Sequence, residues 1–455
     1  MNRISRVVFL SRFGRVAMSV LLSLALMNAV STAQTGKAQT KTPGATFRLL
    51  YSFTGGSDGY SPKGGLVFDD DGALFGTSFL GGTFNGQCPA GCGTVFRLVP
   101  NNGDWKLETI HSFAGYPTDV GHSYAHVTFD KSGNLYGTAD DGGANLCFYG
   151  FPCGGIFKLS PSRGGWDESV IYNFTKHSGE HPYSGLTLYK GVFYGTTWFG
   201  PESSGNVGDG TLFTLALENG AWTHKIIHAF AGGVDGYEPY GDLVFDNDGN
   251  AYGSTPYGGR SLSGDIFELI PNGKGGWAET LLYIFPSNYV SGAYPSTLVF
   301  DSSGNLYGVT DTGGTTKGHD CRIYGCGTVF ELKHSKTGWR QIILYEFAGG
   351  SDGYAPSAGL VFDNAGNLYG TTLVGGTGTC QFYQYPGCGT VFKLTRATDG
   401  KWHKTTLHNF TGGSDGEFPN SGTLILDAAG HLYGATLGGA SYDSSGYGTV
   451  YRITP

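Results

Sequence analysis

The chain is poor in charged residues and shows no helical spacing of its apolar residues. Charged side chains make up 14% of the 455 residues, whereas glycine occurs 79 times and aromatic residues make up another 14%. Glycine accepts the positive φ angles of tight turns, and aromatic residues are typical of β-strands. The glycine motifs of P-loop and dinucleotide-binding proteins are also missing. The sequence therefore predicts many short strands joined by turns.

The N-terminal segment differs from the rest of the chain. Four arginines precede an apolar run from Val16 to Val30, and Ser31-Thr32-Ala33 offers small residues for cleavage. This pattern predicts a secretory signal peptide at residues 1–33, followed by a flexible segment at residues 34–45. An uncleaved membrane anchor is the alternative, which the short run and the polar Asn28 disfavour.

Basic residues become scarcer still once this segment is removed. Residues 1–33 contain four of the 28 lysines and arginines and no acidic residue, so 24 basic residues face 36 acidic ones and the net charge is −12. Such a charge does not attract nucleic acid or anionic lipid. We therefore expect no nucleic-acid partner, no membrane span after signal cleavage, and a monomer.

A phenylalanine that closes a short β-rich phrase recurs at steps of 55 to 63 residues. It occurs seven times, as Phe53, Phe113, Phe174, Phe230, Phe285, Phe347 and Phe410. In the sixth repeat, the predicted strands are Gly359–Asp363, Asn367–Thr372, Gly389–Leu394 and Thr405–Phe410, each bounded by turn residues. Four antiparallel strands repeated seven times predict an all-β fold, a seven-bladed β-propeller over residues 46–455.

The two ends of the repeat array complement each other. The seventh repeat stops at its third strand, Gly448–Ile453, while Thr46–Phe53 has the ending of a fourth strand. We predict that this N-terminal strand completes the last blade and closes the ring. An open solenoid, the alternative, would leave both edges unpaired. In each of the first six repeats, one tryptophan just before the fourth strand is expected to pack between blades: Trp105, Trp166, Trp222, Trp277, Trp339 and Trp402.

Cysteine occurs only as local pairs, at the same place in four of the repeats. The pairs are Cys88/Cys92, Cys147/Cys153, Cys321/Cys326 and Cys380/Cys388, and the other three repeats lack both members. This all-or-none pattern predicts four disulfides and an oxidising compartment, and hence a secreted protein, extracellular or periplasmic. Zinc binding is the alternative, disfavoured because no second pair lies in the same repeat.

Several phrases resemble a known family. GGSDG-x-x-P, LVFD-x-x-GNLYGTT and GTVFKL are similar to the Gloeo/Verruco (GloVer) tandem repeat of secreted bacterial proteins. The resemblance covers nearly all of the chain after residue 33 and is strongest in repeats 1, 6 and 7. It implies an exported repeat protein and provides no catalytic residue to carry over.

One face of the predicted propeller collects the longer loops. Strand direction alternates, so the loops from strand four to the next strand one, and from strand two to strand three, emerge together. This face holds the GGSDG segments and all the cysteine loops, and we expect a ligand to bind there. The aspartates of these segments, Asp58, Asp235, Asp352 and Asp415, favour turn chemistry, with a calcium site as the alternative. No cofactor is firmly implied.

Repeats 2 and 3 depart from the consensus in these loops. Positions that the scaffold does not require are free to bind a ligand, although neutral drift is the alternative. The predicted ligand-binding candidates are His122, His126, His177, Glu180, His181 and Trp198. By the same topology, Asp119, Asp140, Asp141, Phe199 and Glu202 lie nearby. Imidazole and carboxylate could act as acid and base on a glycan or bind a metal, and Trp198 could stack on a sugar ring.

Three functional hypotheses follow from these observations. The leading one is a secreted protein that binds an extracellular ligand, a polysaccharide or a surface protein, through the face with the disulfide loops. The second is a glycan hydrolase or lyase that uses the histidines and acids of repeats 2 and 3. The third is an inert structural envelope protein. A propeller supports all three, and no catalytic residue is assigned.

Overall fold

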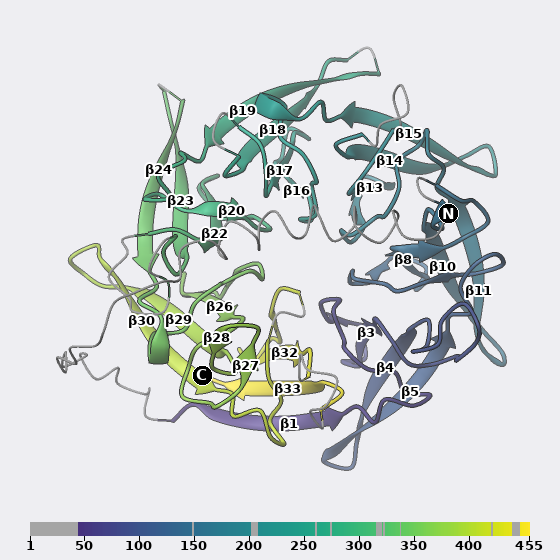
Figure 1. Ribbon diagram of the computed structural model, residues 1–455, viewed down its shortest axis with the longest axis horizontal. Helices are drawn as coiled ribbons and strands as arrows, with labels where there is room; N and C mark the ends of the chain where they lie inside the picture. Colours follow the sequence, from purple (N-terminus) through teal and green to yellow (C-terminus); the bar gives the residue numbers. More distant parts are fainter. Residues whose placement is uncertain are drawn as a thin grey trace, which may run out of the picture.

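The sheets of the molecule form a closed ring. The computed structural model describes residues 44–147, 150–201, 208–259, 262–273, 275–314, 321, 324–336, 338–419, 422–438 and 446–455. Within them, seven antiparallel sheets follow one another around a central axis, with four strands in each blade (Figure 1). The predicted seven-bladed β-propeller is therefore confirmed. The predicted signal peptide lies outside the described residues.

The blades are numbered in chain order, and their strands run from the centre outward. Blade 1 contains β2 (Val67–Phe68), β3 (Leu74–Ser78), β4 (Thr94–Asn101) and β5 (Asp104–Ser112). Blade 2 contains β7 (Thr128–Phe129), β8 (Leu135–Ala139), β10 (Gly155–Ser162) and β11 (Gly165–Asn173). Blade 3 contains β12 (Thr187–Tyr189), β13 (Val192–Thr197), β14 (Thr211–Glu218) and β15 (Ala221–Ala229). Blade 4 contains β16 (Val244–Phe245), β17 (Ala251–Thr255), β18 (Asp265–Pro271) and β19 (Trp277–Ile284).

The remaining blades repeat this order. Blade 5 contains β21 (Val299–Phe300), β22 (Leu306–Thr312), β23 (Thr328–Ser335) and β24 (Gly338–Glu346), with the short β20 (Ala293–Pro295) also paired to β22. Blade 6 contains β25 (Val361–Phe362), β26 (Leu368–Thr372), β29 (Thr390–Arg396) and β30 (Trp402–Asn409). Blade 7 contains β31 (Ile425–Leu426), β32 (Leu432–Thr436), β33 (Thr449–Thr454) and β1 (Thr46–Ser52). The loops contain two small ribbons, β6 (Val120–Gly121) with β9 (Asp141–Gly142) and β27 (Gln381–Phe382) with β28 (Tyr385–Pro386). They also contain two 3-10 turns, η2 (Gly233–Asp235) and η3 (Gly350–Asp352).

The N-terminal strand closes the ring. β1 pairs antiparallel with β33, placing Thr46 opposite Thr454 and Ser52 opposite Thr449. Figure 1 shows β1 in purple along the outer edge of the yellow β33. The predicted closure by the N-terminal strand is therefore confirmed, and β33 is paired along both of its edges.

The repeated phenylalanine forms the core contact between neighbouring blades. Each one lies edge-on to an aromatic ring in the third strand of the next blade, with ring centroids 5.0–5.7 Å apart. The glycine in the second strand makes room for that ring: a Cβ on Gly137 would lie 2.4 Å from Cζ of Phe157. The repeat spacing therefore reflects one packing contact per blade interface, worth about 1 kcal/mol beyond its buried area.

The tryptophans also lie between blades. Trp166 contacts Phe75 of the preceding blade, and Trp222 contacts Tyr136 in the same way. Their position in the chain differs slightly from the prediction, because Trp402 pairs with Arg396 and is already part of β30. The predicted first strand Gly359–Asp363 is also shorter in the structure, where β25 contains only Val361 and Phe362.

All four predicted disulfides are confirmed. Cys88–Cys92, Cys147–Cys153, Cys321–Cys326 and Cys380–Cys388 each close a loop between the second and third strands of one blade. Such bonds fit an extracellular or periplasmic protein. In the described part of the chain, no helix has the length and apolar character that a bilayer crossing requires.

Candidate functional site

Each loop between blades presents one side chain at an equivalent place. The residue has a left-handed backbone, with φ between 54° and 59°, and its N–H donates to a carbonyl in the second-to-third strand loop of the preceding blade, 2.8–3.0 Å away. The seven residues are Ser61, His122, His181, Glu238, Tyr294, Ala355 and Phe418. The scaffold therefore holds the backbone and leaves the side chain free to vary. Blades 2 and 3 place histidine there.

These two histidines belong to a continuous cluster at blades 1 to 3. The cluster, named here the blade 1–3 cluster, consists of Lys63, Phe79, His122, Tyr124, Asp140, Asp141, His181, Tyr183 and Trp198, all half-buried. They come from the loops that lead into the first strands and from the ends of the second strands. Of these residues, His122, His181 and Trp198 were predicted from the sequence, and the two aspartates were expected nearby.

Aromatic rings form one side of this cluster. The Lys63 ammonium lies 3.9 Å from the centroid of Phe79 and 4.1 Å from that of Tyr124. Tyr124 stacks on Tyr183 of the next blade at 4.2 Å, and Tyr183 meets Trp198 edge-on at 4.4 Å. The ring of Phe79 lies 4.5 Å from that of Tyr124, so the rings run without a break across three blades.

Two histidine–aspartate pairs form the other side. Nδ1 of His122 lies 3.3 Å from Oδ2 of Asp141, and Nδ1 of His181 lies 3.1 Å from Oδ1 of Asp140. Phe79 connects the two sides, because its ring centroid is 5.0 Å from that of His122. The cluster thus combines aromatic surface with paired ionisable groups.

Charge interactions set the protonation of the two cationic groups. Burial alone would lower the pKa of His181, but the Asp140 carboxylate, assisted by Glu180 and Asp141, raises it to about 9. Burial lowers the pKa of Lys63 to about 8, an effect that Asp140 partly offsets. Both side chains are therefore mainly cationic at neutral pH, and each has Asp140 as a partner.

The other predicted candidates lie elsewhere. His177 is exposed, and its backbone N–H donates to Oγ1 of Thr175. Glu180 is buried, and its backbone pairs with Phe199 beside the cluster. His126 lies in the central cavity, and Glu202 lies outside the described residues. Of the six predicted residues, the blade 1–3 cluster contains His122, His181 and Trp198.

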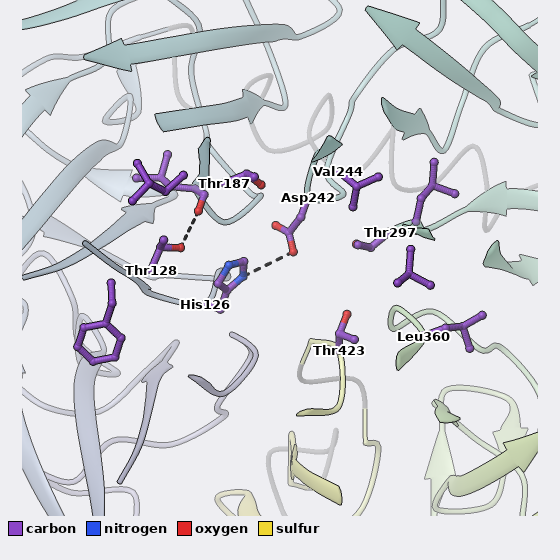
Figure 2. Close-up of a pocket in the computed structure, with 13 residues that line it drawn as sticks. His126, Thr128, Thr187, Asp242, Val244, Thr297, Leu360 and Thr423 are labelled. Carbon is purple, nitrogen blue, oxygen red and sulfur yellow. Dashed lines mark hydrogen bonds and ion pairs between the residues drawn. The ribbon is translucent and has the colours of Figure 1, made fainter. Parts of the chain in front are cut away.

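The central cavity has a volume of about 510 Å³ and is lined by the first strands of blades 2 to 7. Figure 2 shows His126 and Asp242 pointing toward each other across it, with Nδ1 3.5 Å from Oδ2. Gly185 lies between them: its N–H donates to Oδ1 of Asp242, and a Cβ there would collide with the His126 ring. Apart from this pair, hydroxyl and apolar groups line the cavity, such as Thr128, Thr297 and Leu360.

Two aspartates of the GGSDG segments, Asp58 and Asp352, bind their own loops. Asp58 accepts hydrogen bonds from the backbone N–H of Thr54 and from the Tyr51 hydroxyl, and Asp352 does the same with Ala348 and Tyr345. These contacts agree with the turn interpretation, and they leave the carboxylates of Asp58 and Asp352 committed to the scaffold.

A second aromatic group, at blades 4 and 5, was not predicted from the sequence. Tyr237 stacks on Tyr257 at 5.4 Å, Tyr257 meets Tyr294, and Tyr294 approaches Tyr289. The recurrence of tyrosine in the same two loop types was the available signal. A different reason explains why the sequence did not predict Lys63, Tyr124 and Tyr183. Their contacts form only when neighbouring blades stack.

The repeat identifies the family of this chain. The profile of the Gloeobacter/Verrucomicrobia repeat matches residues 29–200, 149–378 and 318–455, which together span nearly the whole sequence. The chain belongs to the Gloeobacter/Verrucomicrobia repeat family. The resemblance to GloVer proteins seen in the sequence is thereby confirmed. A search of curated proteins gives no match to this family member.

Solved structures resemble this repeat protein in fold alone. A fungal alcohol oxidase in complex with copper is 13% identical, with a TM-score of 0.52 over 90% of this chain and 76% of the other. A putative oxidoreductase (glucose dehydrogenase) from Thermus thermophilus is 14% identical, with a TM-score of 0.42 over 90% and 100%. A hypothetical selenium-binding protein from Sulfolobus tokodaii is 14% identical, with a TM-score of 0.47 over 69% and 73%. Their activities do not transfer to this chain.

Proposed function

We propose that this protein is exported and binds a neutral polysaccharide through the blade 1–3 cluster. The observation that carries the proposal is the unbroken run of aromatic rings from Phe79 to Trp198 beside two histidine–aspartate pairs. Sugar rings present apolar C–H faces and a border of hydroxyls. A binding site with aromatic surface and a few fixed polar groups is complementary to both.

The charge distribution supports a neutral ligand. Two cationic groups, Lys63 and His181, lie against two carboxylates, Asp140 and Asp141, so the cluster carries little net charge. The chain without residues 1–33 has a net charge of −12, which would repel an acidic polysaccharide over long range. The same groups offer both donors and acceptors to sugar hydroxyls.

The four disulfides and the N-terminal segment support export. Cell fractionation of the native host tests it: we expect the protein in the periplasm or medium with residues 1–33 removed. Recovery from the cytoplasm with free thiols would contradict this part of the proposal.

Binding is tested on a glycan array, followed by calorimetry with the best neutral glycan. We expect Trp198→Ala and Tyr183→Ala each to weaken binding at least about fivefold, because loss of an aromatic stacking contact costs about 1–3 kcal/mol. Tyr383→Ala is the matched control, since Tyr383 is 84% exposed in the cysteine loop of blade 6, outside the cluster. Equal affinity of all three variants would contradict the site.

A glycan hydrolase or lyase is a second candidate, favoured by the two histidine–aspartate pairs beside the aromatic rings. Imidazole and carboxylate are the usual groups of acid–base catalysis. Release of reducing ends from bound glycans, lost in His122→Ala and His181→Ala, would establish this reaction. Binding without such release supports the binding protein, and the absence of both supports a structural envelope protein.

A further inference from the structure

Each interface between blades has three side chains at fixed positions near the outer strands. The first lies two residues before the repeated phenylalanine of one blade, the second in the following loop at the place of the GGSDG aspartate, and the third six residues before the phenylalanine of the next blade. We call these three positions the outer-strand trio. It is separate from the blade 1–3 cluster, and the proposed function does not use it.

Two of the seven trios consist of histidine, aspartate and glutamate. The first is His111, Asp119 and Glu168, and the second is His228, Asp235 and Glu279. In each, one nitrogen or oxygen per side chain lies within 4.8 Å of the other two. Nε2 of His111 is 3.3 Å from Oδ2 of Asp119, and Nε2 of His228 is 3.5 Å from Asp235 and 3.7 Å from Glu279.

The equivalent positions at blades 5 and 6 show how a trio with an aspartate can balance its charge. There Asp352 accepts a hydrogen bond from the Tyr345 hydroxyl and contacts the Lys404 ammonium at 3.0 Å. Lys404 occupies the position that Glu168 and Glu279 occupy in their own blades. In those two trios a second carboxylate therefore replaces the cation. None of the five other trios, all within the described residues, combines an imidazole with two carboxylates.

The two glutamates have unused hydrogen-bonding capacity. Among the residues that the structure describes, none donates a hydrogen bond to Oε1 of Glu168 or to Oε1 of Glu279, although both atoms are buried. A buried carboxylate oxygen without a donor is costly, and such groups are commonly satisfied by a cation.

We propose that His111, Asp119 and Glu168 form one zinc site and that His228, Asp235 and Glu279 form a second, equivalent one. Zn²⁺ binds imidazole nitrogen and carboxylate oxygen at about 2.0–2.2 Å, so tetrahedral ligands lie about 3.4 Å apart. The separations of 3.3, 3.5 and 3.7 Å match this value. Each ion takes ligands from two neighbouring blades and keeps its fourth position for water.

The ligand set selects zinc over calcium. Ca²⁺ takes six to eight oxygen ligands, whereas each trio supplies three side chains, one of them an imidazole. A third group, formed by Cys380, Cys388 and Glu417, is excluded because both sulfurs are in a disulfide and provide no thiolate. The described part of the chain therefore provides two groups of side chains that suit zinc.

The experiment measures bound metal on the exported chain, prepared without a histidine tag, stripped with EDTA and titrated with ZnCl₂ or CaCl₂. We expect calorimetry and elemental analysis to give two Zn²⁺ per chain and no Ca²⁺ at these sites. Substitution by Co²⁺ should give the visible absorption of a tetrahedral site. Zero or one ion in the parent chain would overturn the proposal, and this readout needs no variant.

Variants assign the sites to residues. Glu168→Gln and Glu279→Gln keep the side-chain shape, and each should reduce the stoichiometry from two ions to one, while the double variant binds none. His408→Tyr is the matched control, because His408 contacts Asp415 but has Phe47 in the third position. It should still bind two ions. Unchanged stoichiometry in the folded double variant would overturn the assignment.

Discussion

At the scale of single residues, a left-handed backbone position brings His181 to the Asp140 carboxylate. Every blade has such a position, and its N–H is used to bind the preceding blade. The side chain at this position differs from blade to blade, and in blade 3 it carries a charge. The resulting pair raises the pKa of His181.

This pair makes stability depend on pH. The pKa of His181 is raised from 6.5 to about 9, so folding favours the protonated form. The stabilisation is fully present below about pH 6.5 and is lost as pH rises toward 9. We expect His181→Asn to lower the free energy of unfolding by at most about 3 kcal/mol at pH 6, because each pKa unit is worth about 1.4 kcal/mol. The loss should be much smaller at pH 9. Asparagine tolerates the left-handed backbone at this position. Urea unfolding across this range measures the difference.

The control for this prediction is His177→Asn, in the same loop. His177 is exposed, so its substitution should change the free energy of unfolding by less than about 0.5 kcal/mol at every pH. A penalty for His181→Asn that stays constant from pH 6 to pH 9 would contradict the charge pairing.

Glycine in the second strand provides another test at this scale. The ring of Phe157 occupies the space where a Cβ of Gly137 would lie, whereas a Cβ on Gly164 would have no atom within 4 Å. We expect Gly137→Ala to lower the free energy of unfolding by about 1–3 kcal/mol through overpacking. Gly164→Ala should be close to neutral, and equal effects of the two substitutions would contradict this role of the glycine. Thermal and urea unfolding of the two variants would distinguish them.

At the scale of elements, the cysteine loops connect blades as well as closing on themselves. The carbonyl of Cys92 accepts the N–H of His122, and that of Cys153 accepts the N–H of His181. Each of these two disulfides therefore fixes the loop that holds a residue of the blade 1–3 cluster. Because each of the four bonds joins cysteines only four to eight positions apart, it stabilises the fold less than a bond that closes a long loop would, on the order of 2 kcal/mol.

Reduction of the disulfides should therefore affect the loops more than the ring. We expect hydrogen exchange to increase in residues 82–93 and in the loop around His122, while the strands of the same blades keep their protection. Blade 4, which has no cysteine pair, serves as the internal control. Cooperative loss of the whole ring on reduction would contradict this division between loop and scaffold.

At the scale of the whole molecule, stability depends on closure. β1 supplies the outer strand of blade 7 and buries Leu50, with Phe53 directly after it, against its neighbours. A chain that starts at residue 54 should lose roughly 3–6 kcal/mol from these two side chains alone, apart from the lost strand pairing. Thermal unfolding compares it with a chain that starts at residue 44, which should match the parent. Equal melting temperatures for the two truncated chains would contradict the role of β1.

Much of this architecture could be predicted from the sequence because the same packing contact recurs in every repeat, and the residues that make it recur with it. Phe113 and its six equivalents recur because each packs on the same ring in the next blade, and the paired cysteines recur because each pair closes the same loop. The incomplete repeats at the two ends of the array likewise predicted that β1 joins blade 7. The fold, the ring closure and the disulfides depend on residues that are close in the chain or that recur periodically, so they can be predicted from one sequence.

The candidate site could be predicted only in part. Departure from the repeat drew attention to His122, His181 and Trp198, which do lie in one cluster, but the same criterion selected His177, which is exposed on its loop. Lys63 and Tyr124 carry no signal in the sequence, because their contact arises between residues of different blades.

The sequence by itself determined the strands, their number in each repeat and the way the ends meet, since these follow from spacing and composition. Tertiary structure alone decided which side chains face each other. His126 reaches Asp242 only because Gly185 leaves space between them, and Glu168 meets His111 only because adjacent blades stack at that distance. Stacking of the blades brings together residues that lie a whole repeat apart in the chain. No local sequence pattern predicts which of these residues come into contact.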